Sequence, residues 1–255
     1  MIDLAGKTVL VTGASKGIGA AIARTLGERG AAVVGHYGSD EAGAAAALAG
    51  VPAERKCLLQ ADLGDAGAVE ALWRSAVAWR NGIDVFVNNA AVMLWHGGFT
   101  APDQDWDAVW AETLAVNVLA PARLIRKAVP HFIGRGGGIL VTISSWAAQR
   151  GVTNPDTIAY AASKAAVKAM AQTVARAHAK DGILSYVIAP GVVRTRMSED
   201  FAATQGGEGP VTAGLATGEW VPPDDIAELV AFLATGKARH LTGATLDVNG
   251  ASYLR

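Results

Sequence analysis

The chain has 255 residues, of which 51% are hydrophobic and 18% charged, and its formal net charge is -1. This length and composition suit one domain with a large buried core, and the scattered basic residues argue against a nucleic-acid partner. Cys57 is the single cysteine, which excludes an intrachain disulfide and a cysteine zinc site and favours the cytoplasm. We expect no signal peptide and no membrane span, because Gly, Pro or charge interrupts the apolar stretches.

Short β-branched runs alternate with Ala-rich runs of helical spacing along residues 1–255. This alternation predicts a single-domain α/β fold of the Rossmann type, a doubly wound parallel sheet of about seven strands with helices on both faces. The expected strands are Thr8–Thr12, Ala32–His36, Lys56–Gln60, Val85–Asn88, Gly138–Ser144, Leu184–Ile188 and Thr245–Val248. The expected helices are Gly19–Gly30, Asp40–Ala49, Ala66–Asn81, Gln104–Phe132, Tyr160–Asp181 and Pro223–Leu233.

Two parts of this pattern are irregular. Pro121 lies inside the fourth expected helix, so that helix is either kinked or divided in two. The segment Arg196–Trp220 is rich in Gly, Ala and Thr and is too long for an ordinary connection. It predicts either a mobile substrate loop over residues 196–220 or a disordered one.

The first expected strand runs directly into a glycine-rich turn that opens the first helix. Such a turn is also common as simple punctuation between elements. Its position between strand and helix favours a dinucleotide site, because glycines let the backbone approach a pyrophosphate at the helix N-terminus. The candidate residues are Gly13, Ser15, Lys16, Gly17, Ile18 and Gly19.

The end of the second strand bears on the choice between NADP(H) and NAD(H). An acid there would bind a free ribose hydroxyl and repel a 2′-phosphate, but the chain has His36-Tyr37-Gly38-Ser39. We therefore expect NADP(H), with Tyr37 and Ser39 beside the ribose and Lys16 able to pair with the phosphate, while NAD(H) stays the alternative. Asp40 follows too late for the ribose and is expected to be a helix N-cap.

Polar residues follow the third and fourth strands at the same sheet edge. Asp62 and Leu63 come after the third strand, and Asn89-Ala90-Ala91 after the fourth. Each group is also typical of a plain turn. Their position at the carboxyl edge, where ligands of open α/β folds bind, adds them to the cofactor-binding candidates.

Tyr160 and Lys164 are four residues apart and share one face of a helix. A nearby ammonium would lower the tyrosine pKa and suit proton transfer, although such a pair is more often a solvated helix face. Ser144 and Ser145 end the fifth strand, where a hydroxyl could hold a carbonyl oxygen near the tyrosine or simply form a turn.

Taken together, these motifs resemble the short-chain dehydrogenase/reductase family, in its 3-oxoacyl-(acyl-carrier-protein)-reductase-like branch. The matching pieces run from Thr12-Gly-Ala-Ser-Lys-Gly-Ile-Gly19 through Asp62-Leu63, Asn88–Ala91, Asn117, Ser145, Tyr160-x-x-x-Lys164, Pro190-Gly191 and Thr195 to Leu241–Gly250. The resemblance implies that Tyr160 is the acid–base residue, that Ser145 orients the carbonyl, and that Lys164 lowers the tyrosine pKa and binds the nicotinamide ribose.

The same resemblance implies further roles. Asn117 would hold a water that links Lys164 to solvent, and Pro190, Gly191, Val193 and Thr195 would lie at the nicotinamide. A homotetramer is implied, with a dimer as the alternative, and no metal is expected. His96 and His131 belong to no ligand cluster and are interpreted as structural or solvated.

The loops expected around the nicotinamide carry Met93, Leu94, Trp95, Trp146, Val192 and Trp220. An apolar pocket of this kind predicts a hydrophobic ketone or a 3-oxoacyl thioester, although some of these side chains would serve packing only. The expected function is NADP(H)-dependent interconversion of a ketone and a secondary alcohol. The alternatives are an NAD-dependent alcohol dehydrogenase working oxidatively and a catalytically silent dinucleotide-binding sensor.

Overall fold

A computed structural model describes residues 2–254, and over these residues seven parallel strands form one sheet in the order β3-β2-β1-β4-β5-β6-β7. The strands are β1 (Thr8–Val11), β2 (Ala32–Tyr37), β3 (Lys56–Gln60), β4 (Val85–Asn88), β5 (Gly138–Ile143), β6 (Ile183–Pro190) and β7 (Thr245–Val248). The predicted Rossmann-type sheet is confirmed. The chain order reverses between β1 and β4, which places the ligand-binding crevice of such a sheet at their carboxyl ends.

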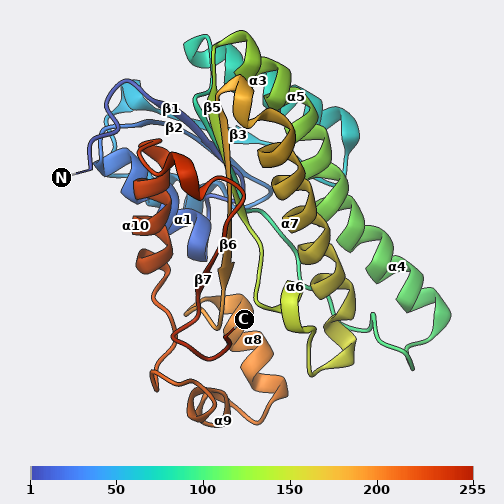
Figure 1. Ribbon diagram of the computed structural model, residues 1–255. Helices are drawn as coiled ribbons and strands as arrows, with labels where there is room; N and C mark the ends of the chain where they lie inside the picture. The colour runs from blue at the N-terminus through green and yellow to red at the C-terminus, as the bar shows by residue number, and fades with distance from the viewer. Residues whose placement is uncertain (1, 255) are drawn as a thin grey trace.

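Helices cover both faces of the sheet (Figure 1). They are α1 (Gly17–Glu28), α2 (Glu41–Ala47), α3 (Ala66–Arg80), α4 (Asp103–Leu114), α5 (Ala120–Gly134), α6 (Ala147–Arg150), α7 (Ile158–His178), α8 (Arg196–Thr204), α9 (Glu208–Ala213) and α10 (Pro223–Ala234). One π-helical turn, η2 (Ala115–Leu119), joins α4 to α5, and short 3-10 turns lie at 53–55, 155–157, 179–181 and 239–241.

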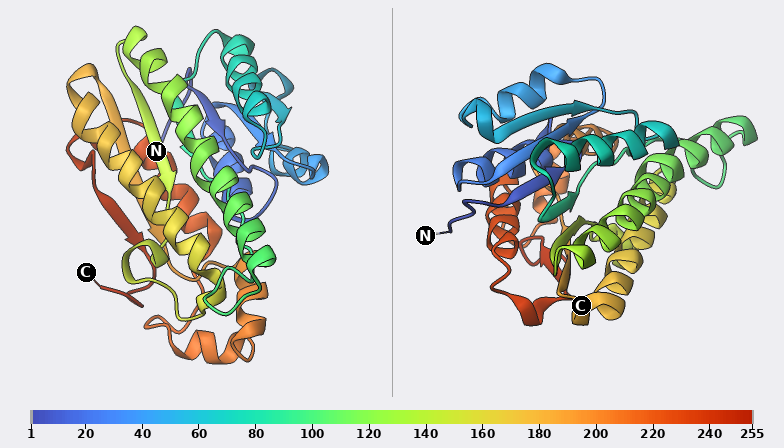
Figure 2. Two further views of the ribbon diagram at one scale, coloured as in Figure 1. Left: turned by 90° about the vertical axis from the view of Figure 1, so that its right-hand side faces the viewer. Right: turned by 90° about the horizontal axis from the view of Figure 1, so that it is seen from above.

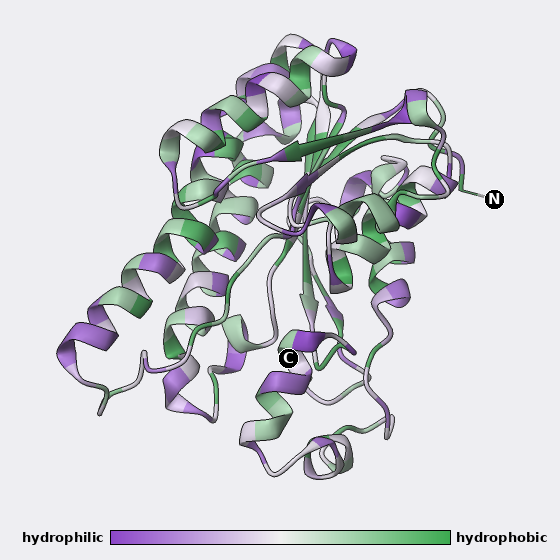
Figure 3. Cartoon of the chain, turned by 180° about the vertical axis from the view of Figure 1, so that it is seen from behind, coloured by the Kyte–Doolittle hydropathy of each residue, from purple (hydrophilic) through white to green (hydrophobic). Residues whose placement is uncertain are grey.

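Two apolar cores hold the layers together, one on each face of the sheet. One core packs α1 and α10 against the sheet, and the other packs α3, α5 and α7 against the opposite face. Figure 3 shows the strands as largely hydrophobic, while the hydrophilic residues gather on the outer turns of the helices. Strands covered on both faces read as continuous apolar runs, which is why the sequence pattern identified them.

The predicted irregularity around Pro121 is a π-helical turn, and the stretch Asp103–Gly134 continues through it as one helical rod. By length and composition alone this rod is apolar enough to cross a membrane, which the sequence pattern did not predict. Its α5 half packs on α3 and α7 as part of the second core, whereas the start of α4 extends beyond the body of the molecule (Figure 2).

Residues 196–220 contain two helices, α8 and α9, that the sequence pattern did not predict. They lie beneath the carboxyl ends of β6 and β7 (Figure 1). The Thr195 hydroxyl caps α8 by accepting a hydrogen bond from the Ser198 amide at 3.4 Å. Trp220 is buried with Val192 and Leu215 in a small cluster that anchors the end of the segment. The segment is therefore structured, and its mobility stays a prediction.

Candidate active site

A cavity of about 960 Å³ lies at the carboxyl edge of the sheet, at the reversal between β1 and β4. It brings together nearly all of the predicted cofactor-binding and catalytic residues. Those that line it are Gly13, Ser15, Lys16, Gly17, Ile18, Gly19, Ser39, Asp62, Leu63, Asn89, Ala90, Ala91, Ser145, Tyr160, Lys164, Pro190, Gly191, Val193 and Thr195. Tyr37 and Asn117 are the two predicted residues outside this lining.

The glycine-rich turn is too tight for side chains at two of its glycines. Gly13 has φ +70°, in the left-handed region that favours glycine. A Cβ on Gly19 would stand 2.0 Å from the Gly13 carbonyl oxygen and 2.4 Å from Asn89 Nδ2. Asn89 fixes the turn by donating from Nδ2 to the Thr12 carbonyl at 2.9 Å. The backbone cradle at the start of α1 therefore fits a pyrophosphate.

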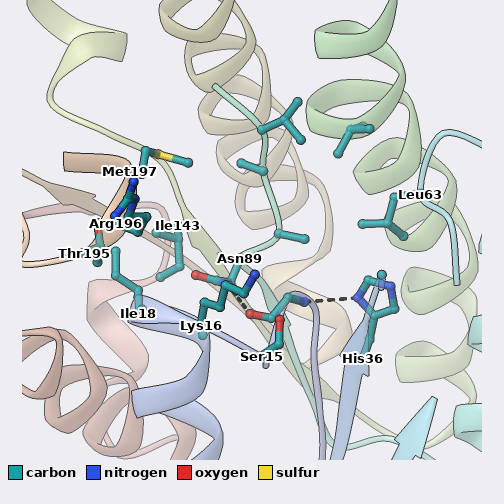
Figure 4. Close-up of a pocket in the computed structure, with 18 of the residues that line it drawn as sticks. Ser15, Lys16, Ile18, His36, Leu63, Asn89, Ile143, Thr195, Arg196 and Met197 are labelled. Carbon is teal, nitrogen blue, oxygen red and sulfur yellow. Dashed lines mark hydrogen bonds between the residues drawn. The ribbon is translucent and has the colours of Figure 1, made fainter. Parts of the chain in front are cut away.

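His36, at the end of β2, is a site residue that sequence reasoning missed. Its Nδ1 accepts a hydrogen bond from the Gly13 amide at 3.1 Å, drawn as a dashed line in Figure 4. Its Nε2 lies 3.1 Å from the Ala61 carbonyl oxygen and donates to it. Both partners are backbone groups, so no sequence motif marks the interaction. One buried imidazole thus connects the first turn to the loop that carries Asp62.

Tyr37 does not line the cofactor cavity, whereas the sequence predicted it beside the ribose. Side chains alternate across a strand, and because His36 lines the cavity, Tyr37 falls on the other face of β2. It is buried, and its hydroxyl bonds to Glu41 on α2. Ser39, two residues further on, does line the cavity.

Lys16 reaches across to Asp40 with an Nζ–Oδ2 distance of 3.3 Å. Asp40 is the N-cap of α2, as predicted, and accepts from the Gly43 amide at 3.0 Å. This amide and the Lys16 ammonium hold the pKa of Asp40 below its usual value. Lys16 is therefore a cation near the end of β2, but it shares its charge with a carboxylate.

Asn117 does not line the cavity itself, but it is hydrogen-bonded to Val92, which does. It is 2% exposed. Its Oδ1 accepts from the Val92 amide at 2.8 Å, and its Nδ2 donates to the Val92 carbonyl at 2.8 Å and to Ser163 Oγ at 3.0 Å. The side chain ties Val92, which follows the Asn89–Ala91 segment, to Ser163 on α7. Pro121 lacks the N–H that an α-helix would direct at the Asn117 carbonyl, so this carbonyl has lost its regular partner.

Ser145, Tyr160 and Lys164 meet where β5 ends against α7. The Ser145 hydroxyl lies close enough to the Tyr160 hydroxyl to lower the pKa of the phenol. Lys164 Nζ donates to the Ile143 carbonyl at 2.9 Å and lies 5.6 Å from the centre of the Tyr160 ring. Ser144 instead donates to the Lys164 carbonyl at 2.9 Å. The geometry therefore places Ser145, and not Ser144, beside the tyrosine.

Burial dominates the protonation of this group. It raises the pKa of Tyr160 to about 12, against a smaller opposite effect of the Ser145 hydrogen bond. It lowers the pKa of Lys164 to about 8. The net pKa of Tyr160 is set by burial, and the effect of Lys164 on it stays a prediction. At neutral pH the phenol is protonated.

A second cavity of about 480 Å³ adjoins the first. Both are lined by Ser145, Tyr160, Gly191, Met197 and Ser198. The second cavity also contacts the apolar side chains of Met93, Trp146, Val192, Phe201, Val211 and Leu215. Of the predicted substrate-loop residues, Met93, Trp146 and Val192 are thus at the cavity, whereas Leu94, Trp95 and Trp220 are not part of its lining.

Of the two histidines singled out in the sequence, His131 is bonded within the protein and His96 is exposed to solvent. His131 accepts from the Ile83 amide at 3.0 Å and packs edge-on against Trp73. His96 is exposed and has φ +69°. Within residues 2–254, no three His, Cys, Asp or Glu side chains cluster in a way that could hold a metal ion.

Comparison with known proteins gives a family for this site and fold. A family model described as enoyl-(acyl carrier protein) reductase matches residues 13–251. The chain is similar to 3beta-hydroxysteroid dehydrogenase 1 of Eggerthella lenta, at 35% identity over 99% of this chain and 95% of the relative. It is 32% identical to the 3-oxoacyl-(acyl-carrier-protein) reductase of Staphylococcus aureus over 97% of this chain and 98% of that one.

A solved structure agrees with these relatives. The crystal structure of 3-oxoacyl (acyl-carrier-protein) reductase from Agrobacterium tumefaciens C58, which has NADP bound, superposes with a TM-score of 0.87 at 33% identity. The match covers 98% of this chain and 95% of the other. The chain is therefore an oxidoreductase that belongs to the short-chain dehydrogenase/reductase family, in the branch that resembles the 3-oxoacyl-(acyl-carrier-protein) reductases.

Proposed function

We propose that this protein reduces a hydrophobic ketone to a secondary alcohol with NADPH, and that Tyr160 supplies the proton. The observation that carries the proposal is the position of Tyr160. Its hydroxyl is close to that of Ser145, and both residues line the large cofactor cavity and the smaller apolar cavity. A carbonyl held by these two hydroxyls would lie between the two cavities.

The large cavity has the features that NADP(H) needs. The glycine turn offers a backbone cradle for the pyrophosphate, and a Cβ at Gly19 would collide with the Gly13 carbonyl that shapes it. The end of β2 has no acid to repel a 2′-phosphate, and Lys16 and Ser39 lie beside it. The similar Agrobacterium enzyme has NADP bound. When bound, NADPH supplies the hydride that the carbonyl carbon accepts.

The protonation state of the site favours reduction. As the carbonyl carbon gains hydride, its oxygen develops negative charge and needs a proton. Tyr160, with a pKa of about 12, carries its proton at neutral pH and can donate it as a general acid. Ser145 orients the same oxygen by a hydrogen bond. Oxidation of an alcohol would instead need the phenolate, which this environment disfavours.

Lys164 and Asn117 support this proton transfer. Lys164, with a pKa of about 8, is mainly cationic at neutral pH, so it stabilises the phenolate that forms when Tyr160 gives up its proton. Asn117 holds Val92 and Ser163 in place, and its main-chain carbonyl has lost its helical partner to Pro121. That carbonyl is the atom we assign to the water that returns a proton from solvent to Lys164.

The proposal also includes the oligomeric state and the cellular location of the protein. Leu114, Leu119 and Ile133 are large apolar side chains on the α4–α5 rod that are 37–49% exposed. An exposed apolar face of this kind is typical of an interface between subunits, which supports the predicted homotetramer. A cytoplasmic location stays a prediction from the single cysteine.

The decisive test combines a cofactor comparison with one substitution. We expect the purified protein to oxidise NADPH, with higher kcat/KM than NADH, when it is given apolar ketones. Tyr160→Phe should lower kcat by roughly 10²- to 10⁴-fold, because a general acid is lost, and should leave the Kd for NADPH unchanged.

Tyr186→Phe provides the matched control. It removes the hydroxyl of another buried tyrosine, which donates to the Ala238 carbonyl at 2.9 Å far from the reaction. This variant should lose some stability and keep its kcat. Turnover that survives in Tyr160→Phe would overturn the assignment of the acid, and tight NADPH binding without turnover on any ketone would favour the sensor alternative.

A further inference from the structure

The second cavity contains one charged side chain among its described lining residues, and that side chain is Arg150. We infer that the substrate is a compact oxo acid, an apolar ketone with a carboxylate a few bonds from the carbonyl, and that Arg150 binds this carboxylate. This inference rests on the proposed ketone reduction and specifies its substrate class.

The backbone places Arg150 at a useful distance from the reacting carbonyl. Arg150 is the last residue of α6, the short helix that begins two residues after Ser145. The Ala148 amide donates to the Ser145 carbonyl at 3.1 Å and the Arg150 amide to the Trp146 carbonyl at 3.2 Å, so the segment is tightly turned, and Ser145 and Arg150 line the same cavity. A carbonyl at Ser145 and an anion at the guanidinium would thus be ends of the same small molecule.

The guanidinium is held in place yet has free donors. It lies over the Trp146 ring at 4.8 Å and near the Tyr253 ring at 5.8 Å. Stacking on aromatic faces fixes the plane of an arginine and leaves its N–H groups directed outward, in the geometry that suits a carboxylate. Within residues 2–254 the Arg150 side chain has no ion pair and no hydrogen bond, so these donors are available to a ligand.

Arg194 shows what the same arrangement looks like when the charge is satisfied inside the protein. It also stacks on a tryptophan, Trp220, at 4.8 Å. However, its Nη1 pairs with Glu208 at 3.3 Å, and it lines neither cavity. In contrast, Arg150 lines a cavity and has no ion pair over the part of the chain that the structure describes, so an anionic ligand can pair with it.

The rest of the cavity favours a small apolar body over a long polar arm. Trp146, Val192, Phe201 and Leu215 line the same cavity as Ser145 and Arg150. In a 3-oxoacyl thioester on a carrier, the phosphate is separated from the carbonyl by the whole pantetheine arm, which is much longer than the single helical turn available here. A carboxylate on the ketone itself matches this distance better.

The test compares an acid with its neutral counterpart in the full-length protein. The probes are β-benzoylpropionate and its primary amide, which have equal size and differ in charge, with acetoacetyl-CoA as the thioester probe. We expect the wild type to favour the acid by about tenfold in kcat/KM, since a charge-assisted hydrogen bond is formed only with the acid. In Arg150→Met this preference should disappear through a higher KM for the acid, with the amide unaffected.

Arg194→Met is the matched control, because it removes an arginine from a tryptophan ring outside the cavities, and it should keep the preference. High salt should weaken the preference in the wild type, since Arg150 lies at the exposed mouth. An equal acid-to-amide ratio in wild type and Arg150→Met would overturn the inference. So would a loss confined to acetoacetyl-CoA, which would assign Arg150 to a thioester carrier. Failure of the wild type to reduce the acid, the amide and acetoacetyl-CoA alike would refute the proposed ketone reduction instead.

Discussion

Acidification below pH 6.5 is expected to destabilise this protein through His36. The imidazole is 2% exposed, and it is neutral as hydrogen-bonded, with Nδ1 accepting from Gly13 and Nε2 donating to Ala61. Burial lowers its pKa below the ordinary value of 6.5. A proton on Nδ1 would turn the acceptor into a donor that faces the Gly13 N–H, so the charged ring cannot keep both bonds.

The sign and size of the effect follow from proton uptake. Between pH 6.5 and the lower pKa of the folded state, the unfolded chain binds a proton at His36 that the folded chain does not. The free energy of unfolding therefore falls as the pH falls through this window, by up to about 1.4 kcal/mol per pH unit. Above pH 6.5 the residue contributes no pH dependence. His131, whose pKa burial also lowers, adds a second contribution of the same sign.

Urea unfolding at several pH values between 8 and 5 measures this slope. His36→Gln should flatten it, because glutamine can accept from Gly13 and donate to Ala61 without titrating. The variant should also keep its affinity for NADPH at pH 5.5 better than the wild type does, since the glycine turn stays in place. His131→Gln is the control for the second histidine. Parallel stability curves for the wild type and His36→Gln would refute the reasoning.

Two further predictions concern the cofactor cavity. Gly19→Ala should raise the Kd for NADPH by about 10- to 100-fold, because the new Cβ meets the Gly13 carbonyl and overpacking costs about 1–3 kcal/mol. Fluorescence titration measures this, with Gly50→Ala, where an added Cβ meets nothing within 4 Å, as the control. Asp40→Asn keeps the helix cap but frees Lys16, so the NADPH-to-NADH ratio of kcat/KM should rise by up to about fivefold. An unchanged or lower ratio would show that Lys16 does not contact the 2′-phosphate.

The sheet and its main helices were predictable because their signals are local. Strands such as β4 and β6 are buried at every position, and a continuous apolar run reports exactly that environment. In contrast, α6, α8 and α9 have between 4 and 9 residues each. Helices this short are not stable alone and depend on tertiary contacts, such as the packing of Trp220, that no local pattern reveals.

The candidate site divides in the same way. The glycine turn, Ser145, Tyr160 and Lys164 stand in motifs with fixed spacing and could be placed on one sheet edge from the sequence. Tyr37 was predicted beside the ribose and His36 was given no role, yet His36 lines the cavity, because neighbouring residues of a strand point to opposite faces. The raised pKa of Tyr160 also escaped prediction, since it depends on burial by segments distant in the chain.

The wall between the two cavities has a consequence for the order of binding. Met197 and Ser198 stand at the start of α8 and line both cavities, so any displacement of that helix reshapes both at once. If the cofactor binds one position of α8 more tightly, it changes the affinity for the ketone by some factor. The ketone then changes the affinity for the cofactor by the same factor. If α8 moves as predicted for residues 196–220, cofactor and ketone are linked ligands, and dissociation of the alcohol should respond to which form of the cofactor is bound.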